Sequence, residues 1–302
     1  MVKNLVLENI SVGFKLPQGV FYAVDDVSLS LPGGNFTAII GESGCGKSVL
    51  GQAILNILPS GVIKKGRVLY NGEQVKKILS AFGIIPQNPS ESLNPVRKIG
   101  KQMQDVLDVH QMADSDNSYK KQCLRLFGLE EAERVLAAYP HELSGGMLQR
   151  VLCAMAVSSK PEWILADEPT KGLDEQVGAV VRKNLLTIKQ DLHLSMLIIT
   201  HDIALAQEVC DDVLVMYAGQ VLEHNMDIWQ KPLHPYTQDF LQALPQNGLQ
   251  VIPGKAPVPG ESFSGCKFAT RCPYCKTRCK EEVPAMQQVG DAEVRCFLYA
   301  EG

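Results

Sequence analysis

The feature that most constrains this chain is the octapeptide GESGCGKS, which runs from Gly41 to Ser48. It matches the pattern G-x-x-x-x-G-K-[S/T], in which backbone N–H groups wrap a phosphate. The pattern needs a strand before it and a helix after it, and the chain supplies the apolar run FTAII and the helix-like run KSVLGQAILNIL in these places. The segment therefore predicts a triphosphate site on an α/β fold, and an unliganded tight turn is the weaker interpretation.

Each residue type in this loop suits a phosphate ligand. Glycines let the backbone N–H groups approach the phosphates, and the following helix N-terminus adds partial positive charge. Lys47 is expected to reach the outer phosphates, and Ser48 to place its hydroxyl on Mg²⁺. The predicted ATP-binding loop consists of Gly41, Glu42, Ser43, Gly44, Cys45, Gly46, Lys47 and Ser48.

Polar residues follow three other apolar runs that read as buried strands. Asp167 and Glu168 end the run WILADE, where Asp167 would hold Mg²⁺ through water and Glu168 would act as general base on the attacking water. His201 follows LIIT and is predicted to bond the γ-phosphate, and Gln87 follows GIIP. An Asp-Glu pair in a turn is usually only solvated, but a phosphate loop in the same chain favours the catalytic interpretation.

A second glycine-rich helix start, LSGGM, contains Ser144, Gly145 and Gly146. A serine and two glycines allow a helix N-terminus to approach a phosphate closely, with backbone donors and a hydroxyl. The alternative is a plain serine N-cap on a structural helix. One nucleotide site has no evident need for two such loops within one chain.

Together these segments resemble the ATP-binding subunits of ABC transporters. GESGCGKS resembles their Walker A segment, LSGGM their signature, ILADE their Walker B segment and Gly172–Asp174 their D-loop, with Gln87 as the Q-loop residue and His201 as the switch histidine. All six occur in the family's order. The resemblance implies that two such domains pack head to tail, with the signature helix of one capping the ATP held by the other.

The resemblance also implies further site residues. Phe14, thirty-three residues before Lys47, matches the aromatic residue on which the adenine stacks, although it could also be a core residue. Gln87 would join Ser48 and Asp167 around Mg²⁺, and Asp174 would make the D-loop contact.

The closest branch is that of oligopeptide, dipeptide and nickel importers, because LNPVRKIGKQ, SGGMLQRV and GCKFATRCPYC resemble it. The sequence TKGLD replaces the more usual Thr/Ser-Ala-Leu-Asp and hints at nickel or a nickel–metallophore complex, so the cargo stays open between peptides and nickel. A soluble ABC ATPase without a transport role and a metal-sensing regulatory ATPase are the alternative functions. A small-molecule P-loop kinase would have no use for the signature.

The predicted fold is a RecA-like α/β P-loop ABC ATPase core over residues 1–244, with an N-terminal antiparallel β subdomain and an α-helical subdomain at about 90–157. Residues 245–302 are predicted to form a linker rich in Pro and Gly and a cysteine-rich extension. The extension is expected to be a small interaction module separate from catalysis.

The chain has nine cysteines, and five of them crowd into its last forty residues. Cys266, Cys272, Cys279 and Cys296 could hold an iron–sulfur cluster or zinc, and some relatives in this branch carry such a cluster on a similar set. Reduced structural thiols and a disulfide formed during handling are the alternatives.

The formal net charge of the 302 residues is −4, so no overall positive field would attract nucleic acid. No apolar run reaches the roughly 18 residues that span a bilayer, and the N-terminus lacks the pattern of a signal peptide. We therefore expect a peripheral protein on the cytoplasmic face of the membrane. Its expected partners are a homologous ATPase subunit in a homodimer or heterodimer, two transmembrane permease subunits and, indirectly, an extracytoplasmic substrate-binding protein.

Overall fold

A computed structural model describes residues 3–17, 19–74, 81–244, 250–258, 261 and 263–300. The chain divides into two compact units, each built from segments far apart in the sequence. Unit 1 contains Met1–Asn4, Pro32–Phe36 and Lys76–Val209, and unit 2 contains Leu5–Leu31, Thr37–Val75 and Cys210–Gly302. Residues 250–258 of the predicted linker carry no helix or strand, and its residues 245–249 and 259–260 lie outside the described part, as does residue 262.

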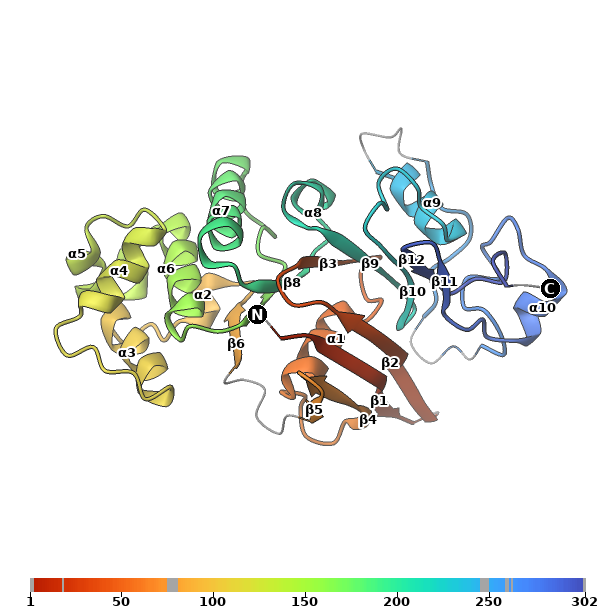
Figure 1. Ribbon diagram of the computed structural model, residues 1–302, viewed down its shortest axis with the longest axis horizontal. Helices are drawn as coiled ribbons and strands as arrows, with labels where there is room; N and C mark the ends of the chain where they lie inside the picture. The colour runs from red at the N-terminus through yellow and green to blue at the C-terminus, as the bar shows by residue number, and fades with distance from the viewer. Residues whose placement is uncertain are drawn as a thin grey trace. The chain divides into compact units, whose positions relative to one another are not determined.

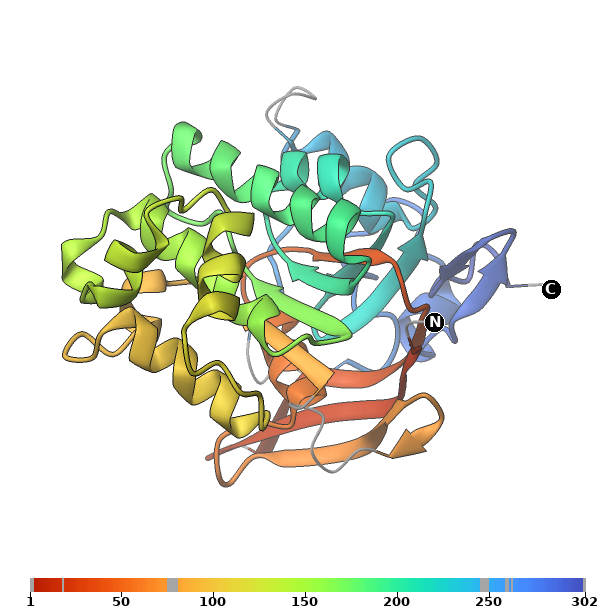
Figure 2. The same cartoon turned by 60° about the vertical axis from the view of Figure 1, so that its left-hand side comes forward.

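An antiparallel sheet opens unit 2. Its strands follow the order β2-β1-β4-β5, and the red and orange arrows show them side by side in both views (Figures 1 and 2). β4 and β5 are joined by an Asn-Gly turn, with φ of 52° at Asn71 and 81° at Gly72. The strands are β1 (Leu5–Leu16), β2 (Gly19–Leu31), β4 (Ile63–Tyr70) and β5 (Glu73–Gln74).

A second set of strands in unit 2 contains the buried run FTAII, which forms β3. β3 pairs in parallel with β9, and antiparallel pairs then lead from β9 to β10, β12 and β11. The strands are β3 (Phe36–Ile40), β9 (Asp212–Tyr217), β10 (Gln220–Asn225), β11 (Gln287–Val289) and β12 (Ala292–Val294).

The helices in the described part of unit 2 are α1 (Lys47–Leu55), α9 (Pro235–Gln242) and α10 (Thr277–Glu281). Helix α1 ends three residues before the end of the helical run KSVLGQAILNIL, because Asn56 adopts a left-handed conformation with φ of 57° and caps the helix.

In the part of unit 1 that the structure describes, parallel strands follow the order β6-β7-β8. Their apolar residues are buried almost throughout, as expected for parallel strands. The elements are β6 (Phe82–Ile85), β7 (Trp163–Asp167), β8 (Ser195–Ile199), α7 (Glu175–Thr187), which continues as a π-helix over Ile188–Leu192, and α8 (Ile203–Val209).

Helices fill the segment of unit 1 for which the sequence predicts them. Figure 1 shows α3, α4, α5 and α6 gathered together in yellow to green. Helix α6 packs against α2, α3 and α4, and most of its residues from Leu148 onward are buried. The elements are α2 (Pro89–Ser92), α3 (Ile99–Val109), α4 (Ser118–Leu126), α5 (Ala132–Ala137), the short 3-10 turn Pro140–Glu142 and α6 (Gly145–Ser158).

Candidate nucleotide-binding site

The predicted phosphate loop lies between β3 and α1, and its backbone needs glycine at two positions. Gly41 has φ of 147° and Gly46 has φ of 107°. A Cβ atom at Gly41 would lie 2.1 Å from the carbonyl oxygen of Met216, and one at Gly46 would lie 2.1 Å from that of Ala23. Any side chain at either position would therefore push the loop away from β9 or β2. At the tip of the loop, Ser43 and Gly44 are exposed.

Lys47 is the first residue of α1, and its side chain folds back onto the loop. The residue is only 7% exposed, and its Nζ donates to the carbonyl oxygen of Gly41 at 2.9 Å and to that of Glu42 at 3.1 Å. Both acceptors are neutral backbone carbonyl groups. A buried cation beside a helix N-terminus suits an anionic ligand.

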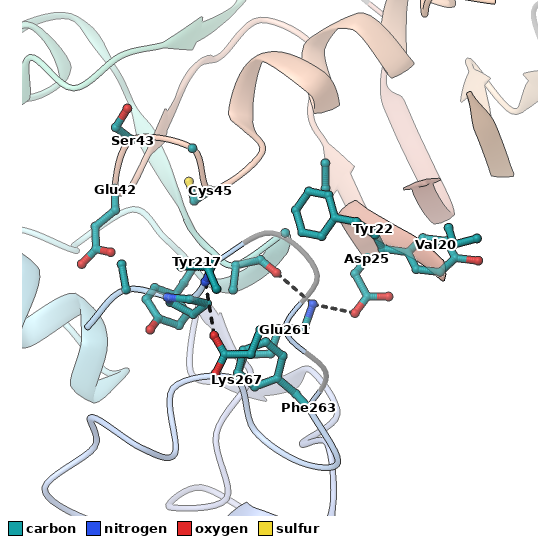
Figure 3. A pocket seen from close by; sticks show the side chains of 18 residues that line it. Val20, Tyr22, Asp25, Glu42, Ser43, Cys45, Tyr217, Glu261, Phe263 and Lys267 are labelled. Atoms are coloured by element: carbon teal, nitrogen blue, oxygen red, sulfur yellow. Dashed lines mark hydrogen bonds and ion pairs between the residues drawn. The ribbon is translucent and has the colours of Figure 1, made fainter. Parts of the chain in front are cut away.

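A cavity of about 500 Å³ adjoins the loop within unit 2 (Figure 3). Tyr22 and Asp25 of β2 line one side. Phe263 and Lys267 line another, and both belong to the C-terminal region, the segment Cys210–Gly302 of unit 2. Lys267 Nζ lies 2.7 Å from Asp25 Oδ2 and donates to the carbonyl oxygen of Ala218 at 2.8 Å. The C-terminal region thus forms a wall beside the phosphate loop, whereas the sequence predicts a module separate from catalysis.

Phe14, the predicted adenine-stacking residue, is partly buried in β1 opposite Phe21. It is not among the residues that line this cavity.

In unit 1, Glu168 and His201 form a hydrogen-bonded pair that the sequence does not predict. His201 Nδ1 lies 2.6 Å from Glu168 Oε2, and the backbone N–H of His201 donates to the same oxygen at 3.3 Å. The Glu168 side chain is 11% exposed, whereas that of His201 is 58% exposed. The two residues meet because Glu168 follows β7 and His201 closely follows β8, and these strands are parallel neighbours.

Gln87 and Asp167 lie at the same edge of this sheet. Asp167 is the last residue of β7, and Gln87 comes two residues after the end of β6. The strands are parallel, with Ile85 opposite Ala166, so both polar residues lie at their carboxyl ends. Gln87 is exposed and Asp167 is partly buried. Ligands of open parallel sheets bind at such carboxyl ends.

The signature serine caps α6, which is the feature that the alternative interpretation of this segment predicts. Ser144 is the N-cap residue, and its Oγ accepts a hydrogen bond from the N–H of Met147 at 3.3 Å. Among the described residues, nothing lies within 4 Å of a Cβ built at Gly145, and only Val177 does so at Gly146. Packing against these residues therefore does not explain either glycine. The D-loop residue Asp174 is the N-cap of α7 and accepts from Val177 N–H at 2.9 Å.

The four cysteines of the predicted metal set line one small apolar cavity of about 20 Å³ in unit 2. Burial raises the pKa of Cys266 and of Cys272 to about 11, which favours protonated thiols. Within the described residues, no group of three or more His, Cys, Asp and Glu side chains is arranged to hold a metal ion. The donor types thus fit a cluster or zinc, but their present arrangement does not. The four residues are Cys266, Cys272, Cys279 and Cys296.

Sequence reasoning missed two residues that touch the phosphate loop. Tyr236 accepts a hydrogen bond from the backbone N–H of Glu42 at 3.1 Å, and Arg271 forms an ion pair of 3.0 Å with the Glu42 carboxylate. Both are far from Glu42 in the sequence, and one sequence carries no spacing signal for such a contact.

Two family models match the chain. Residues 24–171 match the model described as ABC transporter, and residues 223–279 match the one described as oligopeptide/dipeptide transporter, C-terminal region. The dipeptide transport ATP-binding protein DppD of Escherichia coli is 36% identical, over 95% of this chain and 94% of that protein. The chain belongs to the ABC transporter family of ATP-binding subunits, as predicted. It is an ATP-binding protein and an ATPase.

Other relatives match over similar lengths. The oligopeptide transport ATP-binding protein OppD of Haemophilus influenzae is 34% identical over 98% of both chains. The oligopeptide transport ATP-binding protein AppD of Bacillus subtilis is 35% identical over 98% of this chain and 97% of that protein.

Solved structures confirm the predicted ABC ATPase fold. The ATP-binding cassette MJ0796, in a dimeric post-hydrolysis state bound to ADP and Pi, is 25% identical with a TM-score of 0.61 and covers 74% of this chain and 98% of its own. The ABC transporter component cbiO1 of Clostridium perfringens is 26% identical with a TM-score of 0.61, over 74% of this chain and 88% of its own. Among the described residues, no helix is both long and apolar enough to cross a bilayer.

Proposed function

We propose that this ATPase subunit powers the import of peptides through a membrane permease pair, by forming and releasing an ATP-bound dimer. The observation that carries the catalytic part is the 2.6 Å pair of His201 Nδ1 and Glu168 Oε2 at the end of a buried strand. It supports a fixed carboxylate that accepts a proton from water.

The phosphate loop would bind ATP through its backbone N–H groups and Lys47. The Lys47 ammonium donates to two neutral carbonyls, and charged phosphate oxygens are stronger acceptors. Ser48, Gln87 and Asp167 are the proposed Mg²⁺ set, because hydroxyl, amide and carboxylate oxygens suit this ion. Mg²⁺ would supply charge neutralisation on the phosphates. Phe14 remains the proposed stacking partner of the adenine.

Glu168 would act as the general base in hydrolysis. Its carboxylate is held by two donors from His201, the ring and the backbone N–H. A held carboxylate loses little freedom when water binds, so the proton transfer needs little reorganisation. The exposed part of the His201 ring would bond the γ-phosphate.

Ser144, Gly145 and Gly146 would cap the ATP of a partner ATPase subunit, and Asp174 would take part in the same interface. The open space around Gly145 supports this proposal, because a glycine that packing does not require suits a surface that another molecule approaches. ATP bound between two such subunits would hold them together, and its hydrolysis would release them. The partner would be a second copy of this chain or a homologous subunit.

Peptide is the proposed cargo because the relatives described above are named for oligopeptide or dipeptide transport. Nickel and a nickel–metallophore complex are the competing cargoes. The subunit would bind two permease subunits at the cytoplasmic face of the membrane, and a substrate-binding protein would deliver cargo from the other side.

The test is uptake of a labelled dipeptide, a labelled oligopeptide and labelled nickel in cells that lack this gene. The intact protein should restore peptide uptake, and Glu168→Gln should not restore it although it accumulates to the same level. Nickel uptake that depends on Glu168, with unchanged peptide uptake, would replace the peptide proposal. If uptake of the dipeptide, the oligopeptide and nickel were all unchanged in cells that lack the gene, an ATPase without a transport role would be favoured.

The split site has its own test. Ser144→Arg should abolish ATP hydrolysis while the affinity of the monomer for ATP stays within about twofold of the intact protein, since Ser144 would serve the opposite site. Weaker ATP binding by the monomer would contradict a site shared between subunits.

Metal binding by the four cysteines is a separate proposal. It requires the thiols to lose protons and turn toward one centre. Protein purified without oxygen should carry iron with sulfide, or zinc, and replacement of Cys272 and Cys279 by Ser should remove it. Metal-free protein with titratable thiols would identify the four cysteines as structural.

A further inference from the structure

We propose that Tyr236 and Arg271 are positioning residues, through which the C-terminal region holds Glu42 and so raises the affinity of the phosphate loop for ATP. This inference rests on the proposed role of the loop in binding ATP. It adds to that role two residues that lie about 190 and 230 positions beyond Glu42 in the chain.

Glu42 is held at each of its polar groups. Its backbone N–H donates to the Tyr236 hydroxyl at 3.1 Å, and its carbonyl oxygen accepts from Lys47 Nζ at 3.1 Å. Its carboxylate accepts from Arg271 Nη1 at 3.0 and 3.3 Å. Three partners from separate parts of unit 2 therefore determine the conformation of one loop residue.

Arg271 is itself fixed by its surroundings. Its side chain is 5% exposed, its Nε donates to the carbonyl oxygen of Pro253 at 2.8 Å, and its Nη1 donates to the Tyr217 hydroxyl at 3.2 Å. The guanidinium also lies over the rings of Tyr217 and Phe268. An arginine that is buried and bonded in this way is a rigid partner, and removal of one member of such a pair leaves the other charge poorly compensated.

Tyr236 is equally fixed. It is completely buried, and its ring centroid lies 4.6 Å from that of Tyr217 and 5.4 Å from that of Phe268. The ring packing sets the place of the hydroxyl, and the hydroxyl sets the place of the Glu42 N–H. Figure 3 shows Glu42 and Ser43 adjacent along the loop, with Tyr217 below them.

Fixing Glu42 restricts Ser43 and Gly44, the exposed residues that follow it and belong to the predicted ATP-binding set. A loop that starts from a fixed residue loses less conformational entropy when it wraps a phosphate. Loss of either contact should thus weaken ATP binding without slowing the chemical step.

Affinity for MgATP is measured on full-length protein that carries Glu168→Gln to prevent turnover. Tyr236→Phe keeps the ring packing and removes only the acceptor of the Glu42 N–H, so the dissociation constant should rise about fivefold. Arg271→Gln should raise it about tenfold. In proteins with Glu168 intact, the same changes should raise KM for ATP and leave kcat within about twofold.

Two controls separate positioning from a general loss of structure. Tyr299→Phe removes a comparable hydroxyl of the same C-terminal region, which donates to the carbonyl oxygen of Leu233 at 2.9 Å, and should leave ATP affinity unchanged. Arg271→Gln added to Glu42→Ala should weaken binding less than twofold further, because the partner is already absent.

Unchanged ATP affinity in both Tyr236→Phe and Arg271→Gln, with hydrolysis intact, would overturn the inference and leave the proposed function standing. If Arg271→Gln weakened ATP binding by the same factor with and without Glu42→Ala, the inference would also be overturned for Arg271. Failure of the intact protein to bind ATP would instead overturn the proposed function.

Discussion

His201 Nδ1 lies 2.6 Å from Glu168 Oε2, and Glu168 has a left-handed backbone conformation with φ of 49°. Few residues other than glycine adopt such a conformation, and it persists where other contacts enforce it. Here the N–H of Glu168 donates to the carbonyl oxygen of Ile199 at 2.7 Å. The carboxylate is thus held through both its backbone and its side chain.

Replacement of His201 should therefore affect the chemical step. We expect His201→Ala to lower kcat for ATP hydrolysis by about 100-fold, since the carboxylate loses the donor that orients it, while KM for ATP changes less than about threefold. Steady-state ATPase kinetics measure both constants. His110→Ala, at the end of α3, is the matched control and should keep the full rate. A change confined to KM would contradict a role of His201 in the chemical step.

The two glycine-rich loops should respond differently to alanine. Gly46→Ala would place a Cβ 2.1 Å from the Ala23 carbonyl oxygen, and so should abolish ATP binding and lower the melting temperature. The Cβ of Gly145→Ala meets no atom of the described residues within 4 Å, so this change should keep the melting temperature and monomer ATP binding while ATP turnover falls. Thermal unfolding and ATPase assays compare the variants. Full turnover by Gly145→Ala would count against the capping role of the signature.

His224 should make stability depend on pH. Burial opposes its charged form, but hydrogen bonds to Asp212 and Glu293 outweigh burial and raise its pKa from 6.5 to about 9. This stabilisation is fully present below pH 6.5, where His224 is protonated in the folded and unfolded chains alike. It decreases as the pH rises from 6.5 and is lost once the pH has passed 9, because over this range the folded chain keeps a proton that the unfolded chain has released.

The pKa shift of His224 corresponds to about 3 kcal/mol of unfolding free energy. Between pH 6 and 9.5, the intact protein should lose about this much more unfolding free energy than His224→Gln, measured by urea unfolding. Equal losses in the two proteins would show that His224 is not charged in the folded state.

Much of the fold could be predicted because local patterns determine it. The glycines at 41 and 46 occupy backbone conformations that other residues rarely adopt, and the Asn71-Gly72 turn is specified by its two residues. The apolar runs that became β3, β7 and β8 are buried on both faces, so they read as strands without further context.

The contacts between distant segments could not be predicted. The pairing of Glu168 with His201 follows from the neighbouring positions of β7 and β8, which one sequence does not specify. The contact of Arg271 with Glu42 depends on the path of the C-terminal region, and neither residue type nor spacing indicates it. The roles of the cysteines stay predictions because their placement in one cavity does not by itself make a metal site.

Bound and hydrolysed ATP should be measured side by side in the intact protein and in Glu168→Gln. We expect Glu168→Gln to bind MgATP with near-normal affinity but to convert it to ADP at least about 100 times more slowly. Lys47→Ala, which changes the proposed phosphate-binding residue instead of the base, should show no ATP binding. ADP formation by Glu168→Gln at the rate of the intact protein would contradict the claim that Glu168 is the base of this ATPase.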